Sequence, residues 1–135
     1  MINKHGIDPF NSTHLANVLR ARDVETLVLL GVWTNYVVEA TARTGADSGY
    51  RIIVVTDGCA SDTEDHHQFF ITQILPMLGT AATASDVIAA LDYLVAHRQQ
   101  LGVDVINLSL GHPITEPAGD DPLVHAVERA ARAGI

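Results

Sequence analysis

Hydrophobic positions along the chain fall into two alternating patterns. Continuous apolar runs, such as those in TLVLL at 26–30 and RIIVVT at 51–56, are typical of strands buried on both faces of a sheet. Between these runs, apolar residues recur three and four positions apart, as in helices with one buried face. The apolar runs predict strands at 1–4, 26–30, 51–56, 80–83 and 103–110.

The helical spacing predicts helices between these strands. Thr34 and Asn35 are good N-cap residues for a helix that runs towards residue 48. Pro76 is expected to kink or end a helix over 62–78, because proline has no backbone N–H to donate. Further helices are expected from residue 11 or 12, with Leu15, Val18 and Leu19 on one face, from Ser85 as a cap, and from Pro122 to a stop at Gly134.

Strands that alternate with helices indicate an α/β fold. We expect a three-layer α/β/α arrangement, in which a doubly wound, mostly parallel sheet of about four or five strands is covered on both faces. Residues 1–135 are expected to form a single domain. In such sheets, sites form at the carboxyl ends of the strands, so candidate chemistry is sought there.

Charge and composition narrow the class of protein. The chain has 135 residues, a net charge of −8 and no cluster of lysine and arginine, which argues against partners such as nucleic acid or an anionic membrane. No apolar run is long enough to predict a membrane span. Cys59 is the single cysteine, which excludes an internal disulfide and fits a cytoplasmic location, or recombinant production alone.

Several motifs at the strand ends carry a resemblance. Lys4, the phenylalanine and threonine of DPFNSTHL, LLGVWTNYVVEATAR and GYRIIVVTDGCAS together resemble the second half of an isochorismatase-like cysteine hydrolase. That family includes nicotinamidases and N-carbamoylsarcosine amidohydrolases, and the resemblance covers about residues 1–84. It implies that Lys4 occupies the catalytic lysine position, that Thr34 lies near the oxyanion region, and that the Val32–Trp33 peptide is cis or has relaxed to trans.

The same resemblance places Val37 at the position of the nucleophilic cysteine. A helix start offers unpaired N–H groups and a partial positive charge, which favour a thiolate there. Valine keeps the packing and removes the sulfur, and the family's catalytic aspartate belongs to a part of the fold that this sequence does not match. Lys4 and Val37 are therefore interpreted as vestigial positions, with no catalytic residue and no cofactor expected, and an enzyme is not favoured.

Residues 86–135 resemble an internal piece of a subtilisin-like serine protease. VDVINLSLG is the core of this match, and Ser109, Leu110 and Gly111 would form an edge of the substrate cleft without catalytic residues. The two resemblances meet near residues 82–92 with no linker between them. The main interpretation is therefore an engineered or recombined chimera without an evolved catalytic function.

Other hypotheses remain open. A residual amide hydrolase would act through Lys4 and water, or through Cys59. A binding module would accept a peptide along 109–111, or form a homo-oligomer through uncovered sheet edges or faces. A metal site in DTEDHHQ, for example Asp62 with His66, is the weaker interpretation, so no metal is expected. The isolated histidines are expected at the surface, and two aromatic residues near the site are expected to pack: His14, His97, His125, Trp33 and Tyr36.

Overall fold

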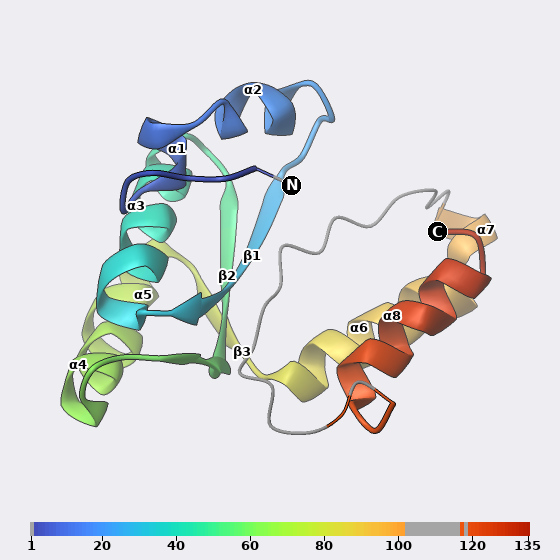
Figure 1. Ribbon diagram of the computed structural model, residues 1–135. Helices are drawn as coiled ribbons and strands as arrows, with labels where there is room; N and C mark the ends of the chain where they lie inside the picture. Colours follow the sequence, from blue (N-terminus) through green and yellow to red (C-terminus); the bar gives the residue numbers. More distant parts are fainter. Residues whose placement is uncertain (1, 102–116, 118) are drawn as a thin grey trace.

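The computed structural model describes residues 2–101, 117 and 119–135. In these ranges the sheet has three strands, all parallel and in the order β1-β2-β3 (Figure 1). The strands are β1 (Thr26–Val32), β2 (Arg51–Ala60) and β3 (Thr80–Ala82). The predicted strand at 103–110 lies outside the described residues.

Strands β1 and β2 pair over their predicted apolar segments and continue beyond them. Thr26 lies opposite Arg51, and the register shifts between Leu29 and Gly31 before Gly31 pairs with Cys59. Gly31 has a backbone φ of +125°, a conformation that residues other than glycine rarely adopt. This irregularity directs the end of β1 into the turn that carries the candidate site.

Helices lie on both sides of the sheet, as the α/β/α expectation requires. One face is covered by the helices that follow β1 and β2 together with the helix at 15–20, whereas α6 (Ala84–Ala96) and α8 (Pro122–Arg132) lie on the other side (Figure 1). The first helices are α1 (Pro9–Ser12), α2 (Leu15–Arg20), the π-helical turn η1 (Thr34–Val38) and α3 (Glu39–Asp47). The others are α4 (Glu64–Phe69), the π-helical turn η2 (Phe70–Ile74), α5 (Leu75–Leu78), α6 (Ala84–Ala96), α7 (Arg98–Leu101) and α8 (Pro122–Arg132).

The main core lies between the sheet and the helices that follow β1 and β2. Its buried members come from α2, β1, η1, α3, β2, η2 and α5: Leu19, Leu27, Val38, Ala42, Ile52, Val54, Phe70 and Leu75. Gly45 lets α3 approach the sheet closely, because a Cβ there would lie 2.9 Å from Ile52 Cδ1. Burial of these side chains is the main force that holds α3 and the 64–78 helices on the sheet.

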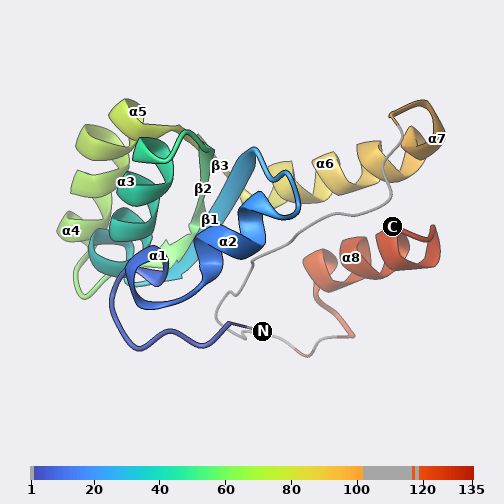
Figure 2. The same cartoon turned by 90° about the horizontal axis from the view of Figure 1, so that it is seen from above.

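The N-terminal segment differs from the prediction. Residues 2–4 form no regular strand, and the first helix begins at Pro9, with Asp8 as its N-cap. The Asp8 carboxylate accepts the N–H of Phe10 at 2.9 Å and the hydroxyl of Thr44 at 2.6 Å, so it also fastens this segment to α3. Helix α2 lies beside β1, the edge strand of the described sheet (Figure 2).

The 62–78 helix accommodates its proline by a change of helix type. Pro76 lies inside α5, and the turn before it is the π-helical η2. A π turn alters the hydrogen-bond pattern where proline lacks a donor and its ring crowds the preceding carbonyl groups. The helix therefore continues for two residues after Pro76 and ends before Gly79.

The start of α6 is set by Thr83 rather than by the predicted Ser85. Thr83 and Asp86 form a capping box, in which each side chain accepts the other's backbone N–H. The hydrogen bond from the Thr83 backbone N–H, and after it the one from the Thr83 hydroxyl, lower the pKa of the Asp86 carboxyl. The Asp57 carboxylate in the second half of β2 also accepts the N–H of Ala84 at 2.8 Å, which ties α6 to the sheet.

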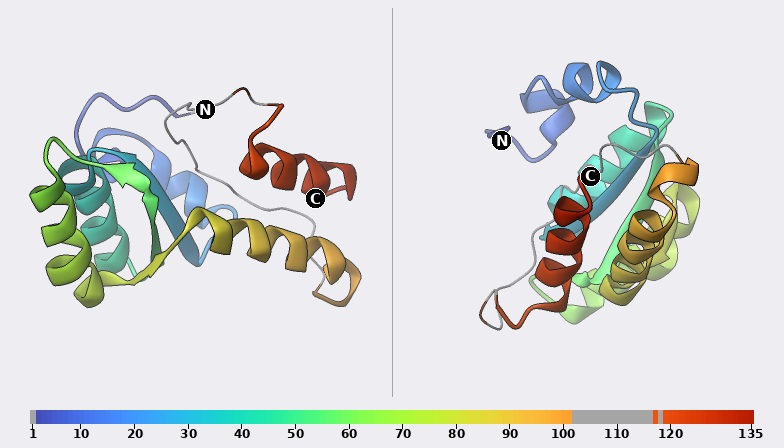
Figure 3. Two further views of the ribbon diagram at one scale, coloured as in Figure 1. Left: turned by 90° about the horizontal axis from the view of Figure 1, so that it is seen from below. Right: turned by 90° about the vertical axis from the view of Figure 1, so that its right-hand side faces the viewer.

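Helices α6 and α8 lie side by side and extend away from the sheet (Figure 3). Asp121 caps α8 by accepting the N–H groups of Leu123 and Val124, as the sequence predicts. Arg129 of α8 forms a bidentate ion pair with Asp92 of α6. Among the helices within the described ranges, none is both long and apolar enough to cross a membrane.

Candidate active site

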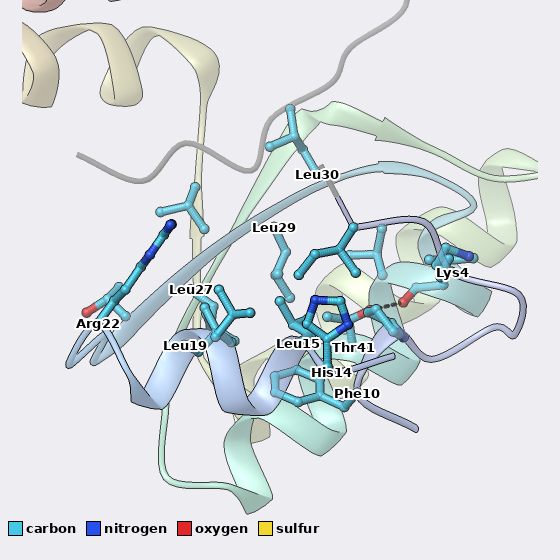
Figure 4. Close-up of a pocket in the computed structure, with 17 residues that line it drawn as sticks. Lys4, Phe10, His14, Leu15, Leu19, Arg22, Leu27, Leu29, Leu30 and Thr41 are labelled. Carbon is cyan, nitrogen blue, oxygen red and sulfur yellow. Dashed lines mark hydrogen bonds between the residues drawn. The ribbon is translucent and has the colours of Figure 1, made fainter. Parts of the chain in front are cut away.

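A cavity of about 610 Å³ runs along β1 on its α2 side. Its walls are formed by the N-terminal segment with α2, by Thr26–Leu30 of β1, and by the start of the helix after β1. Most of the lining is apolar, and the volume lies in the range of pockets that hold small molecules. Figure 4 shows these walls converging on one hollow.

The cavity brings together the two positions that the resemblance singled out. Lys4 and Val37 both belong to its lining although they are far apart in sequence. Lys4 is exposed, and its Nζ donates to the carbonyl oxygens of Gly6 at 3.1 Å and Ile7 at 3.5 Å. The ammonium is thus held by its own loop, at one end of the site in Figure 4.

The turn that carries Val37 has its backbone donors engaged. The carbonyl oxygen of Trp33 accepts the N–H groups of Tyr36 at 3.1 Å, Val37 at 3.0 Å and Val38 at 3.3 Å. The N–H of Asn35 donates to Ser61 Oγ at 3.3 Å. The unpaired donors expected at this helix start are therefore largely satisfied within the turn. The Val32–Trp33 peptide that leads into the turn is cis.

Thr34 points away from the cavity. Its side chain is fully buried, and its Oγ1 lies 2.8 Å from Nδ1 of the buried His67. Thr34 is not among the residues that line the cavity. The position that the resemblance associates with the oxyanion region thus makes an internal contact with α4.

Cys59 lacks the properties of a nucleophile. Burial raises the pKa of its thiol from the ordinary 9.0 to about 11; a hydrogen bond with the Gly31 backbone opposes the rise, and the charge of Asp57 adds to it. A thiol with this pKa is protonated at neutral pH, whereas the thiolate is the reactive form. Cys59 also lies outside the lining of the cavity.

The acidic and histidine-rich segment DTEDHHQ, residues 62–68, has side chains both at the surface and in the interior. Asp62 Oδ1 and His66 Nδ1 lie 2.8 Å apart at the surface, and the hydrogen bond from His66 lowers the pKa of Asp62. His67, the next residue, points inward to Thr34. Within the described ranges, no three metal-ligating side chains gather at one place.

His14 is a cavity residue that the sequence analysis placed only at the surface. It is exposed and stands at the N-cap position of α2. His14 nevertheless belongs to the lining of the cavity, and it lies between Lys4 and Arg22 in the view of Figure 4. Among the described residues that form the lining, none is acidic.

The predicted cleft edge at Ser109, Leu110 and Gly111 lies outside the described residues. No placement of these three positions follows from the structure. The cavity beside β1 is accordingly the candidate site.

Comparison with known proteins identifies the family. A model described as Isochorismatase domain matches residues 1–86. YecD, an isochorismatase family protein of Escherichia coli O157:H7, is 32% identical over 82 residues, which cover 61% of this chain and 44% of YecD. Nicotinamidase 3 of Arabidopsis thaliana is 34% identical over 68 residues, which cover 50% of this chain and 34% of that protein.

The fold agrees with this match. A solved structure of an isochorismatase family protein from Burkholderia thailandensis has a TM-score of 0.65 and 42% identity, covering 67% of this chain and 48% of that one. This chain spans less than half the length of the curated relatives it matches, 44% in the case of YecD.

These findings correct the main functional interpretation. A chimera without an evolved catalytic function is contradicted, because the family model and its amidase relatives account for most of the chain and favour the hydrolase alternative. The subtilisin-like resemblance of residues 86–135, and with it the engineered join, has no support in any comparison. The chain belongs to the isochorismatase family, whose model matches residues 1–86.

Proposed function

We propose that the protein is a hydrolase of small primary amides and that the cavity beside β1 binds the substrate. The observation that carries this proposal is that the family's lysine position, Lys4, and nucleophile position, Val37, line the same cavity. The family match adds to it, because the relative named Nicotinamidase 3 is by that name an amidase. The apolar walls suit the organic part of such a substrate.

Water is the nucleophile in this proposal. Valine at position 37 offers no side chain that could form a covalent intermediate, and the high pKa of Cys59 argues against the single thiol of the chain as the nucleophile. The water oxygen forms a bond with the amide carbonyl carbon, and the bond between carbon and nitrogen then breaks. The products are ammonia and a carboxylic acid, so no oxidant, reductant or second substrate is consumed.

His14 and Lys4 have separate roles in this reaction. His14 accepts the proton of the attacking water and returns it to the leaving nitrogen, because an imidazole nitrogen can serve as a general base and then as a general acid. Lys4 leaves the carbonyl oxygens of Gly6 and Ile7 and places its positive charge beside the oxygen that becomes negative. Its flexible four-carbon stem permits this movement.

Ammonia release from a panel of amides tests the proposal. Nicotinamide, benzamide and succinamate are suitable probes, because they differ in shape and charge. The protein should release ammonia above the rate in buffer, and Lys4→Met and His14→Gln should each lower that rate. His5→Gln and Cys59→Ala are matched controls, because both residues lie outside the cavity lining.

Two results would contradict the proposal. Ammonia release at the buffer rate with every probe would exclude amide hydrolysis by this chain. Loss of activity in Cys59→Ala, with activity retained in Lys4→Met, would support the alternative in which Cys59 is the nucleophile.

A further inference from the structure

We infer that His67 is a positioning residue that fixes the direction in which residue 37 faces, by holding the first residue of the η1 turn through Thr34. The inference concerns the geometry of the cavity wall. It stands independently of which molecule the cavity binds.

The contact between Thr34 and His67 joins two elements that are distant in sequence. Thr34 begins η1, directly after β1, whereas His67 lies in α4. Thr34 Oγ1 and His67 Nδ1 are 2.8 Å apart, and the two side chains are 0% and 9% exposed. A buried polar group that loses its hydrogen-bond partner destabilises the folded protein, so the position of each of these two side chains favours the position of the other.

A second contact fastens the same turn to the same region. Ser61, in the connection between β2 and α4, donates its hydroxyl to Asn35 Oδ1 at 2.7 Å. The N–H of Asn35 donates back to Ser61 Oγ at 3.3 Å. The first two residues of η1 are therefore held by side chains that follow β2.

These anchors act on residue 37 through one helical turn. The Val37 N–H donates to the Trp33 carbonyl, which also accepts the N–H groups of Tyr36 and Val38. The Val37 carbonyl accepts the Thr41 hydroxyl at 2.7 Å. With its backbone held at both ends, residue 37 faces the cavity only while Thr34 keeps the turn in this orientation. His67 is the residue that keeps it there.

A fluorine label at residue 37 can report this orientation directly. In a Cys59→Ala, Val37→Cys protein, the new thiol is alkylated with a trifluoromethyl reagent and observed by ¹⁹F NMR. One narrow resonance is expected, because the turn has one arrangement. His67→Ala should replace it with several or broadened resonances.

Two further variants separate positioning from stability. His67→Asn carries a side-chain amide near the place of Nδ1 and should restore the single resonance. Thr34→Val, which removes the hydroxyl at nearly constant volume, should reproduce the effect of His67→Ala and serves if that variant does not fold. Thr34→Ser should keep the single resonance.

His66→Ala is the matched control, because His66 is the neighbouring residue and its side chain lies at the surface, beside Asp62. It should leave the resonance unchanged. Urea titration of each variant measures stability separately. A single unshifted resonance in folded His67→Ala and Thr34→Val proteins would overturn the inference, whatever the result of the amidase assays.

Discussion

The Thr41 hydroxyl donates to the carbonyl oxygen of Val37 across one helical turn, with 2.7 Å between Oγ1 and O. Thr41 is buried and also lines the cavity, whereas Val37 is half-buried. The backbone at residue 37 is therefore fixed while its side chain remains accessible from the cavity. A side chain with chemical reactivity at this position would act on whatever the cavity holds.

Val37→Cys should increase amide hydrolysis. A thiol at this position can attack the carbonyl carbon that water attacks in the natural chain, and the partial positive charge of a helix start favours its thiolate form. We expect the rate to rise by about tenfold or more, equal to a barrier lower by about 1.4 kcal/mol. Ammonia release per enzyme, with iodoacetamide inactivation, checks this.

Tyr36→Cys provides the matched comparison for that variant. It introduces a thiol one residue earlier, at an exposed position outside the cavity lining. Its rate should equal that of the natural chain. Equal rates in both cysteine variants would show that a thiol at residue 37 reaches the substrate no better than a thiol at residue 36.

Cys59 should make the protein less stable at alkaline pH. Burial raises the pKa of its thiol from 9.0 to about 11, so the unfolded chain releases this proton at a lower pH than the folded protein. The free energy of unfolding should be unaffected by this group below pH 9.0 and should fall as the pH rises from 9.0 to about 11. Urea titrations across this range measure the fall.

Cys59→Ala should remove this part of the pH dependence. Alkylation supplies an independent check, because a protonated thiol reacts slowly, and Cys59 in the folded protein should resist iodoacetamide at neutral pH. An alkaline loss of stability that persists unchanged in Cys59→Ala would assign the effect to other groups.

Gly79→Ala should destabilise the fold. Gly79 ends the helix that leads into β3, and a Cβ at this position would overlap the backbone carbonyl of Ile52 in β2. A backbone group cannot move aside as a flexible side chain can, so we expect a loss of about 1–3 kcal/mol in the free energy of unfolding. Gly119→Ala, where nothing described lies within 4 Å of the new Cβ, should change it by less than about 0.5 kcal/mol.

Self-association remains a prediction, and the structure indicates where to test it. Val32, Trp33 and Tyr36 are 59%, 53% and 51% exposed at one turn, and the rings of Trp33 and Tyr36 meet edge to face. Exposed apolar groups that cluster in this way favour contact with another protein surface. Light scattering should detect a homo-oligomer, and Trp33→Lys should shift it to monomer at the same concentration.

Tyr93→Lys is the control for that experiment. Tyr93 is 56% exposed on α6 and stacks on His97, so it offers similar apolar area at another place. The oligomer should persist in this variant. A natural chain that is monomeric at every concentration tested would reject the prediction.

The parts of the fold that the sequence predicts are those governed by local patterns. Apolar runs identify β1 and β2, and Asp121 with Pro122 identifies the start of α8, because these signals act within a few residues. The cap of α6 was placed two residues late, since Ser85 and Thr83 are both suitable and only the reciprocal bonding with Asp86 decides between them.

The candidate site depends more on tertiary placement. The family motif predicts Lys4 and Val37, whereas the inclusion of His14 depends on the tertiary placement of α2 beside β1. The subtilisin-like interpretation, which no comparison supports, rests on a pattern of low specificity. A short apolar strand followed by an amphipathic helix occurs in many α/β folds, so such a segment carries little information on ancestry or function.

The hydrogen bond from Ala84 to Asp57 has a consequence for how the molecule opens. It joins α6 to the second half of β2, but it lies at the surface, where water competes for both partners. The buried apolar residues of α6 and α8 are one leucine and two alanines, Leu91, Ala126 and Ala130. They do not belong to the main core beneath α3. The amide protons of this helix pair should therefore exchange with solvent through a partial opening, before those of β1 and β2, as a separate cooperative unit.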